Sequence, residues 1–166
     1  LLHVLMDNNM HESTGGQATV SGNVDFSAVA AASGYPSVVA ASDPDALRAR
    51  ARARSLCAEM HAGFTALRSH CPMNIEAALP EVGARVLATE AAVTRDLQRI
   101  DSMWSEQLQA SGGPCLFGEF CIADAYFAPV VARTRGYELP LSAAARAYAD
   151  RIWAAPGVRA WVADAL

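Results

Sequence analysis

The sequence contains no lysine, so arginine supplies all thirteen of its basic residues. Seventeen acidic residues outnumber them, which gives a net charge of −4 and a pI of about 5.5. This balance argues against nucleic acid as a main partner, because nucleic-acid-binding domains usually carry an excess of positive charge. A composition rich in alanine and free of lysine is typical of a GC-rich genome and indicates little about function.

No apolar run in the sequence is long enough to span a membrane, because charged residues interrupt every candidate. The amino terminus also lacks a basic leader followed by a long apolar stretch, so we predict no secretory signal. We therefore expect a cytoplasmic protein that has no membrane partner. The first residue is leucine rather than methionine, which is compatible with a fragment of a longer protein.

The cysteines and histidines lack the spacing of a metal or redox site. No two cysteines stand in a C-x-x-C pair, and the four histidines do not cluster with them at ligand spacing. We expect no metal site, and four reduced thiols that pack mostly as small hydrophobic side chains. These thiols belong to Cys57, Cys71, Cys115 and Cys121.

The chain changes character near residue 42. Residues 1–42 are rich in Gly, Ser, Ala and Val without a sustained period, and contain only weak candidate strands at 1–6 and 18–20. After them, hydrophobic side chains recur at intervals of three and four residues, which is typical of helices. Helices are predicted at about 43–71, 81–110, 122–135, 142–154 and from 156 onward. We therefore predict an all-α bundle of about five helices at 43–166, preceded by an irregular or remnant α/β segment at 1–42.

The predicted helix 122–135 is apolar on nearly every side, which places it in the middle of the bundle. Its first amides then need partners other than water. Asp124 has the spacing to accept a hydrogen bond from the amide of Cys121, as in a capping box. Its charge also suits the positive end of a helix. We predict a structural capping box in which Cys121 is the weaker half, because sulfur is a poor acceptor.

Four arginines stand at alternate positions early in the first predicted helix. They are Arg48, Arg50, Arg52 and Arg54. This pattern predicts either a patch that binds an anion or an ordinary solvated helix face, and the sequence leaves both interpretations open.

Residues 118–124, GEFCIAD, resemble the pattern G-x-x-[ST]-x-A-D of the glutathione transferases, with Cys121 at the Ser/Thr position. In that family the pattern begins the buried central helix of the carboxy-terminal helical domain. Residues 56–75 resemble the first long helix of this domain in a bacterial branch of the family, and residues 148–162 resemble its last helices. The resemblance implies that residues 43–166 are a glutathione transferase helical domain.

The resemblance also implies a reaction. Members of the family activate the thiol of glutathione, their co-substrate, and the thiolate attacks a small hydrophobic electrophile. The activating residue belongs to an amino-terminal thioredoxin-like domain, and residues 1–42 are too few to complete one. We interpret this segment as a truncated or aberrant form of that domain. The sequence therefore identifies no catalytic residue and leaves open whether the chain is an enzyme.

Three residues are assigned to glutathione by resemblance alone. Glu12 and Ser13 match the positions that hold the γ-glutamyl end of glutathione in the family. Arg54 is a candidate neighbour of a glutathione carboxylate. The competing interpretation is that Glu12 and Ser13 are ordinary polar residues of a loop.

Three further residues are assigned to the electrophile site by the same resemblance. Met60, His61 and Phe64 lie on the helix that forms one wall of that site in the family. The competing interpretation places Met60 and Phe64 in the core and His61 at the surface.

Two other classes of function compete with a transferase. Helical domains of this type also serve as non-catalytic assembly modules, and a homodimer formed through the first two long helices is what the resemblance implies. A thiol-dependent redox protein that uses Cys57 or Cys121 is disfavoured, because both residues fall on predicted buried faces.

Overall fold

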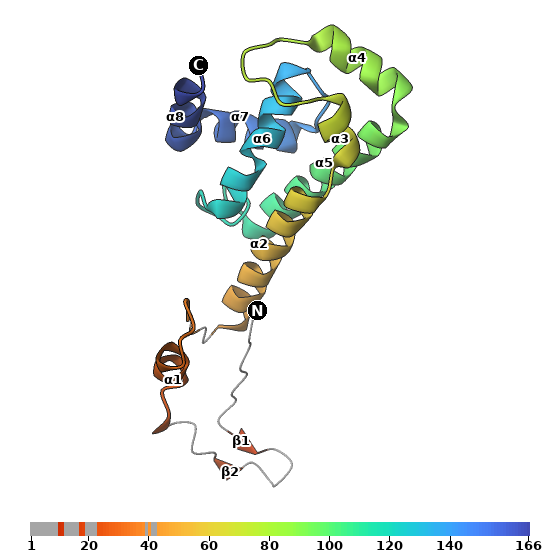
Figure 1. Cartoon of the computed structure of the whole chain (residues 1–166). Helices are drawn as coiled ribbons and strands as arrows, with labels where there is room; N and C mark the ends of the chain where they lie inside the picture. The colour runs from red at the N-terminus through yellow and green to blue at the C-terminus, as the bar shows by residue number, and fades with distance from the viewer. Residues whose placement is uncertain (1–9, 12–16, 19–22, 39, 41–42) are drawn as a thin grey trace. The chain divides into compact units, whose positions relative to one another are not determined.

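Figure 1 shows the computed structural model of the chain. It describes residues 10–11, 17–18, 23–38, 40 and 43–166. The chain divides into two compact units, Leu1–Ala46 and Leu47–Leu166. The described residues form eight helices and two short strands, and this predominance of helix agrees with the predicted all-α class.

The first unit contains a short antiparallel pair and one helix. Strands β1 (Met10–His11) and β2 (Gln17–Ala18) pair with Met10 opposite Ala18. The predicted strand 1–6 lies outside the described residues, and the predicted strand 18–20 overlaps β2 only at residue 18. Helix α1 (Phe26–Ala32) was not predicted, because its residues show no sustained helical period.

The predicted helix 43–71 was wrong as a single element. It forms α2 (Pro44–Ala62) and α3 (Thr65–His70), separated at Phe64, whose φ of 57° lies in the left-handed region. That conformation is costly for a residue with a side chain. The ring of Phe64 is buried, and its burial offsets the cost. The break lies at Gly63 and Phe64, although the apolar pattern predicts that the helix continues. A Cβ at Gly63 would lie 2.5 Å from the carbonyl oxygen of Glu59, so this position also favours glycine.

The predicted helix 81–110 is also divided in two. It forms α4 (Pro80–Thr89) and α5 (Ala91–Ser111), with Glu90 outside helical geometry at φ −116° and ψ 80°. Helix α5 ends at Ser111, one residue beyond the predicted end at 110. Gly112 adopts a left-handed φ of 63°, and its amide donates to the carbonyl of Leu108 at 3.0 Å.

The last three helices lie close to their predicted bounds. They are α6 (Ile122–Gly136), α7 (Ala143–Ala154) and α8 (Pro156–Asp164). The hydroxyl of Ser142 accepts a hydrogen bond from the amide of Ala145, which caps α7. The two breaks described above account for seven helices at 44–164 where five were predicted. None of the helices in the described ranges is long and apolar enough to cross a membrane.

Three aromatic rings form the centre of the helical unit, one each from α5, α6 and α7. The ring of Trp104 meets Phe127 edge-on, with centroids 5.6 Å apart, and Tyr148, with centroids 4.9 Å apart. All three side chains are almost fully buried. Such edge-to-face pairs stabilise a core beyond the area they bury. This cluster fixes the start of α6 against α7.

Candidate functional site

The carboxylate of Asp124 ties together the start of α6, the loop before it and α7. Its Oδ2 accepts a hydrogen bond from the amide of Cys121 at 2.8 Å, which is the contact that the spacing predicts. Its Oδ1 accepts hydrogen bonds from the amide of Leu116 at 3.1 Å and from the hydroxyl of Tyr148 at 2.9 Å. The side chain has no exposed surface. A carboxylate with three internal donors and no access to solvent has a structural role.

Cys121 forms the other half of this capping box. Its backbone is extended, and its sulfur faces the backbone amide of Asp124 in capping-box geometry, as a weak acceptor. Burial is the main reason that the pKa of its thiol is raised. The sulfur of Cys121 therefore occupies the acceptor position of the capping box but forms only a weak hydrogen bond there.

The backbone conformation of Gly118 explains why a glycine stands at the first position of the pattern. Gly118 has a φ of 92°, a conformation that residues with side chains rarely adopt. Its amide donates to the carbonyl of Cys115 at 3.1 Å, and the amide of Cys115 donates back to its carbonyl at 3.3 Å. This tight turn brings Leu116 within reach of Asp124.

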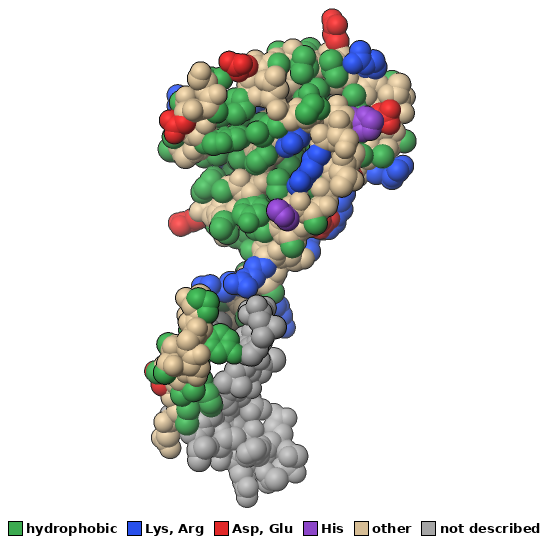
Figure 2. Space-filling view, in the orientation of Figure 1, with side chains coloured by type: hydrophobic (Ala, Val, Ile, Leu, Met, Phe, Trp, Pro, Cys, Tyr) green, Lys and Arg blue, Asp and Glu red, His purple; other side chains and the backbone are tan. Residues whose placement is uncertain are grey.

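The start of α6 is not buried on every side, and this part of the sequence prediction was wrong. Ala123, Phe127 and Val131 face the core, whereas Ile122 is 69% exposed and Tyr126 is 41% exposed. Phe120, just before the helix, is 48% exposed. Figure 2 shows hydrophobic side chains gathered on the face of the helical unit that carries α6. We call Phe120, Ile122 and Tyr126 the α6 apolar patch.

The residues assigned to the electrophile site lie at the end of α2 and just beyond it. Met60 and Phe64 belong to the buried core cluster, and His61 between them is exposed. Arg54 is exposed on the same helix. These positions match the competing core and surface interpretation of the sequence.

Glu12 and Ser13 lie outside the described residues. No part of their assignment to glutathione is therefore tested by geometry.

Two arginines that the sequence analysis did not single out hold the ends of α2 and α3. The guanidinium of Arg68 donates to the carbonyl of Met60, and Nε of Arg133 donates to the carbonyl of Cys71 at 3.0 Å. Burial, and then the nearby charge of Arg68, lower the pKa of Arg133. Their donors satisfy carbonyls at helix ends, where the chain cannot supply helical partners.

The four thiols show no sign of activation. Burial is the main cause of a raised pKa at Cys57, Cys71 and Cys115, as it is at Cys121. The negative charge of Asp124 raises the pKa of Cys57 and Cys115 further. A reactive thiol needs the opposite shift, which positive neighbours or a helix dipole produce. In the described part of the chain, no group of three or more His, Cys, Asp or Glu residues is arranged to hold a metal ion.

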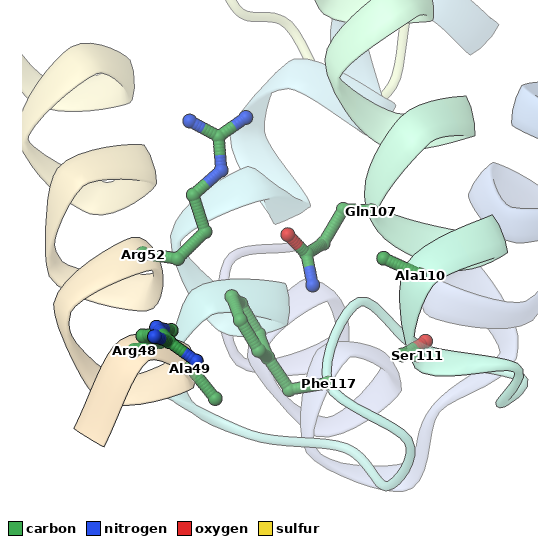
Figure 3. Close-up of a pocket in the computed structure, with 7 residues that line it drawn as sticks. All are labelled: Arg48, Ala49, Arg52, Gln107, Ala110, Ser111 and Phe117. Carbon is green, nitrogen blue, oxygen red and sulfur yellow. The ribbon is translucent and has the colours of Figure 1, made fainter. Parts of the chain in front are cut away.

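A cleft of about 370 Å³ lies between the first turns of α2 and the last turns of α5. Figure 3 shows the residues that line it. They are Arg48, Ala49 and Arg52 from α2, Gln107, Ala110 and Ser111 from α5, and Phe117 from the loop before α6. Of the four arginines early in α2, Arg48 and Arg52 line the cleft, whereas Arg50 and Arg54 do not.

Comparison with known proteins gives one partial similarity. The chain is 53% identical over 47 residues to phosphonopyruvate decarboxylase from Streptomyces viridochromogenes, and equally to the enzyme of that name from Streptomyces hygroscopicus. The match covers 28% of this chain, and the chain spans only 12% of the length of each relative. No family model matches the chain.

This similarity leaves most of the helical unit without a counterpart. The unit Leu47–Leu166 has 120 residues, from 166 − 47 + 1, so 47 matched residues leave at least 73 of them unmatched. A segment of that size does not show the family of the whole chain.

Proposed function

We propose that the helical unit is the carboxy-terminal domain of a glutathione S-transferase-like protein. Together with a thioredoxin-like domain, it would conjugate the thiolate of glutathione to a small hydrophobic electrophile. The observation that carries the proposal is the buried Asp124 box that follows the turn at Gly118. It supports the resemblance because that pattern begins the central helix of the family's helical domain.

The α6 apolar patch supports the need for a second domain. Three large apolar side chains that are 41–69% exposed at one end of a single helix form a surface that a partner domain would cover. In this proposal Arg54, Glu12 and Ser13 contact glutathione, and Met60, His61 and Phe64 face the electrophile. The dimer expected from the resemblance is part of the same proposal.

The first experiment uses the full chain. Isothermal titration calorimetry with glutathione and an assay with chlorodinitrobenzene measure binding and conjugation. We expect weak binding and no conjugation, because no residue of the chain is identified that would stabilise the thiolate. Conjugation by the purified chain would show that it needs no added domain.

The second experiment supplies the missing part. The thioredoxin-like domain of an active bacterial glutathione transferase is joined ahead of residue 43, and conjugation is measured. We expect activity, and we expect the double variant Ile122→Ser/Tyr126→Ser to lose it. Met73→Ser is the matched control, because Met73 is also 41% exposed but lies outside the α6 apolar patch. A folded, inactive chimera would contradict the proposal.

The α6 apolar patch also fits a second candidate, the non-catalytic assembly module. In that case the chain forms a stable oligomer through the patch and has no affinity for glutathione. Analytical ultracentrifugation of the chain and of the Ile122→Ser/Tyr126→Ser variant distinguishes the two candidates. An oligomer that dissociates in the variant, in a chain that does not bind glutathione, favours the assembly module.

A further inference from the structure

The cleft between α2 and α5 has the composition of a binding site for an organic anion. Arg48 and Arg52 are four residues apart, so their side chains extend from the same face of α2, and Figure 3 shows both at the cleft. None of the seven lining residues is acidic. The pKa of the nearby Glu59 is lowered mainly by its hydrogen bonds from Arg99 and also by the charge of Arg52, so this carboxylate is already bound elsewhere. The remaining positive charge at the cleft favours a negative ligand.

Hydrogen-bond donors remain available in this cleft. Among the residues that the structure describes, Arg52 and Gln107 make no side-chain hydrogen bond with each other or with other residues. The hydroxyl of Ser111 is already engaged, since it donates to the carbonyl of Cys115 at 3.1 Å and accepts from the amide of Gly113 at 3.3 Å. Arg52 and Gln107 are therefore the groups that can bind a ligand, and Ser111 shapes the wall.

The rest of the lining is apolar. The ring of Phe117 is half-buried, and Figure 3 shows it between the side chains of α2 and those of α5. The methyl groups of Ala49 and Ala110 complete this surface. A flat aromatic face next to guanidinium groups suits a planar ligand that carries its charge at one edge.

The two walls of the cleft are held together by an ion pair. Nε of Arg99, on α5, donates to Oε1 of Glu59, on α2, at 2.6 Å, and its Nη2 donates to Oε2 at 2.8 Å. This two-bond pair fixes α2 relative to α5 beyond the cleft. The backbones of the two walls are therefore linked before a ligand enters the cleft.

We propose that this cleft binds a small aromatic carboxylate, with the carboxylate on Arg52 and Gln107 and the ring on Phe117. The site is separate from the proposed glutathione chemistry, because it uses none of the residues assigned to glutathione or to the electrophile. Its volume of about 370 Å³ is at the lower end of the range for small-molecule sites.

The test uses naphthoate and its neutral analogue naphthylmethanol, titrated into the full chain by isothermal titration calorimetry. We expect naphthoate to bind at least about tenfold more tightly, because a charge-assisted hydrogen bond contributes enough free energy for that ratio. Sodium chloride should weaken only the naphthoate binding. Equal binding of the two compounds, or no saturable binding of naphthoate, would overturn the proposal.

Variants assign the binding to the cleft. Arg52→Gln should lower naphthoate affinity about tenfold and leave naphthylmethanol unchanged. Arg50→Gln is the matched control on the same helix, since Arg50 is exposed and does not line the cleft. An equal loss in both variants would indicate a general positive field instead of a site, and would overturn the proposal.

Two further variants keep the test independent of Arg52. Phe117→Leu keeps an apolar side chain but removes the flat ring, so it should weaken both compounds. Gln107→Leu should weaken naphthoate alone. Circular dichroism confirms that each variant is folded, and unchanged naphthoate binding in both folded variants would contradict the assignment of the site.

Discussion

Helices α1 and α6 each have an aspartate at or near their first residue that accepts a backbone hydrogen bond, but one aspartate is exposed and the other is buried. Asp25 is the N-cap of α1, and its carboxylate accepts from the amide of Ala28 at 2.9 Å at an exposed position. Asp124 is the third residue of α6, and it accepts three hydrogen bonds without any exposed surface. Asp25 therefore caps its helix from the N-cap position at the surface, whereas Asp124 does so from the third helical position in the core.

The difference lies in what each helix buries. None of the seven residues of α1 is buried, whereas eight of the fifteen residues of α6 are. A helix of two turns without packing is marginal in water, because nucleation costs more than one cap returns. A capping aspartate alone adds only about 1 kcal/mol to the stability of a helix. Its effect on the whole fold is larger when the helix that it caps packs into the core.

The largest expected effect is the loss of the buried carboxylate. Asp124→Ala leaves the amides of Cys121 and Leu116 and the hydroxyl of Tyr148 without their partner. We expect the free energy of unfolding to fall by about 3–5 kcal/mol, the usual cost of removing one member of a buried polar cluster. Urea unfolding followed by circular dichroism measures it. A loss below about 1 kcal/mol would place Asp124 in the same class as a surface cap.

Tyr148→Phe removes one of the three donors and keeps the ring. The amides of Cys121 and Leu116 still satisfy the carboxylate, so we expect a smaller loss of about 1–2 kcal/mol. The same urea experiment applies. If the loss equalled that of Asp124→Ala, the hydroxyl of Tyr148 would be the main partner and the capping bond to Cys121 a minor one.

The sequence predicted the helices whose ends are marked by local signals. Ser142, Pro156 and Gly112 each mark a helix end, and each end lies where the sequence predicts it. The breaks in the first two predicted helices were missed, because the apolar pattern continues across both of them. The conformation of Phe64 follows from burial of its ring. The first turn of α3 is held by Oδ2 of Asp96, which accepts from the amide of Leu67 across 29 positions of sequence.

The same distinction applies to the candidate sites. The bond from Cys121 to Asp124 spans three residues and follows from spacing, whereas the bond to Tyr148 spans twenty-four and has no sequence signal. The early arginines were identified as a candidate anion patch, but Gln107 and Phe117 join the cleft only through the tertiary fold. The assignments of Glu12 and Ser13, of glutathione and of the dimer stay predictions.

A modest gain is expected when the weak half of the α6 box is improved. Cys121→Ser places a good acceptor opposite the amide of Asp124, and we expect about 0.5–1 kcal/mol of added stability. For a chain of this length, that raises the melting temperature by about 1–4 °C. Cys71→Ser is the control, because Cys71 is fully buried outside the box and its hydroxyl analogue should destabilise. An unchanged or lower melting temperature in Cys121→Ser would contradict the capping role of this position.

The smallest change in the free energy of unfolding is expected for a substitution of Asp25. Asp25→Ala removes the cap of α1, so amide hydrogen exchange over residues 26–32 should become faster. The urea midpoint of the chain should not change, because α1 buries no side chain whose packing depends on the cap. Hydrogen-exchange mass spectrometry and urea unfolding of one sample test both statements. A fall in the global free energy of about 1 kcal/mol or more would mean that α1 unfolds cooperatively with the helical unit. In that case, the number of buried residues in each helix would not explain why Asp25 and Asp124 contribute differently to stability.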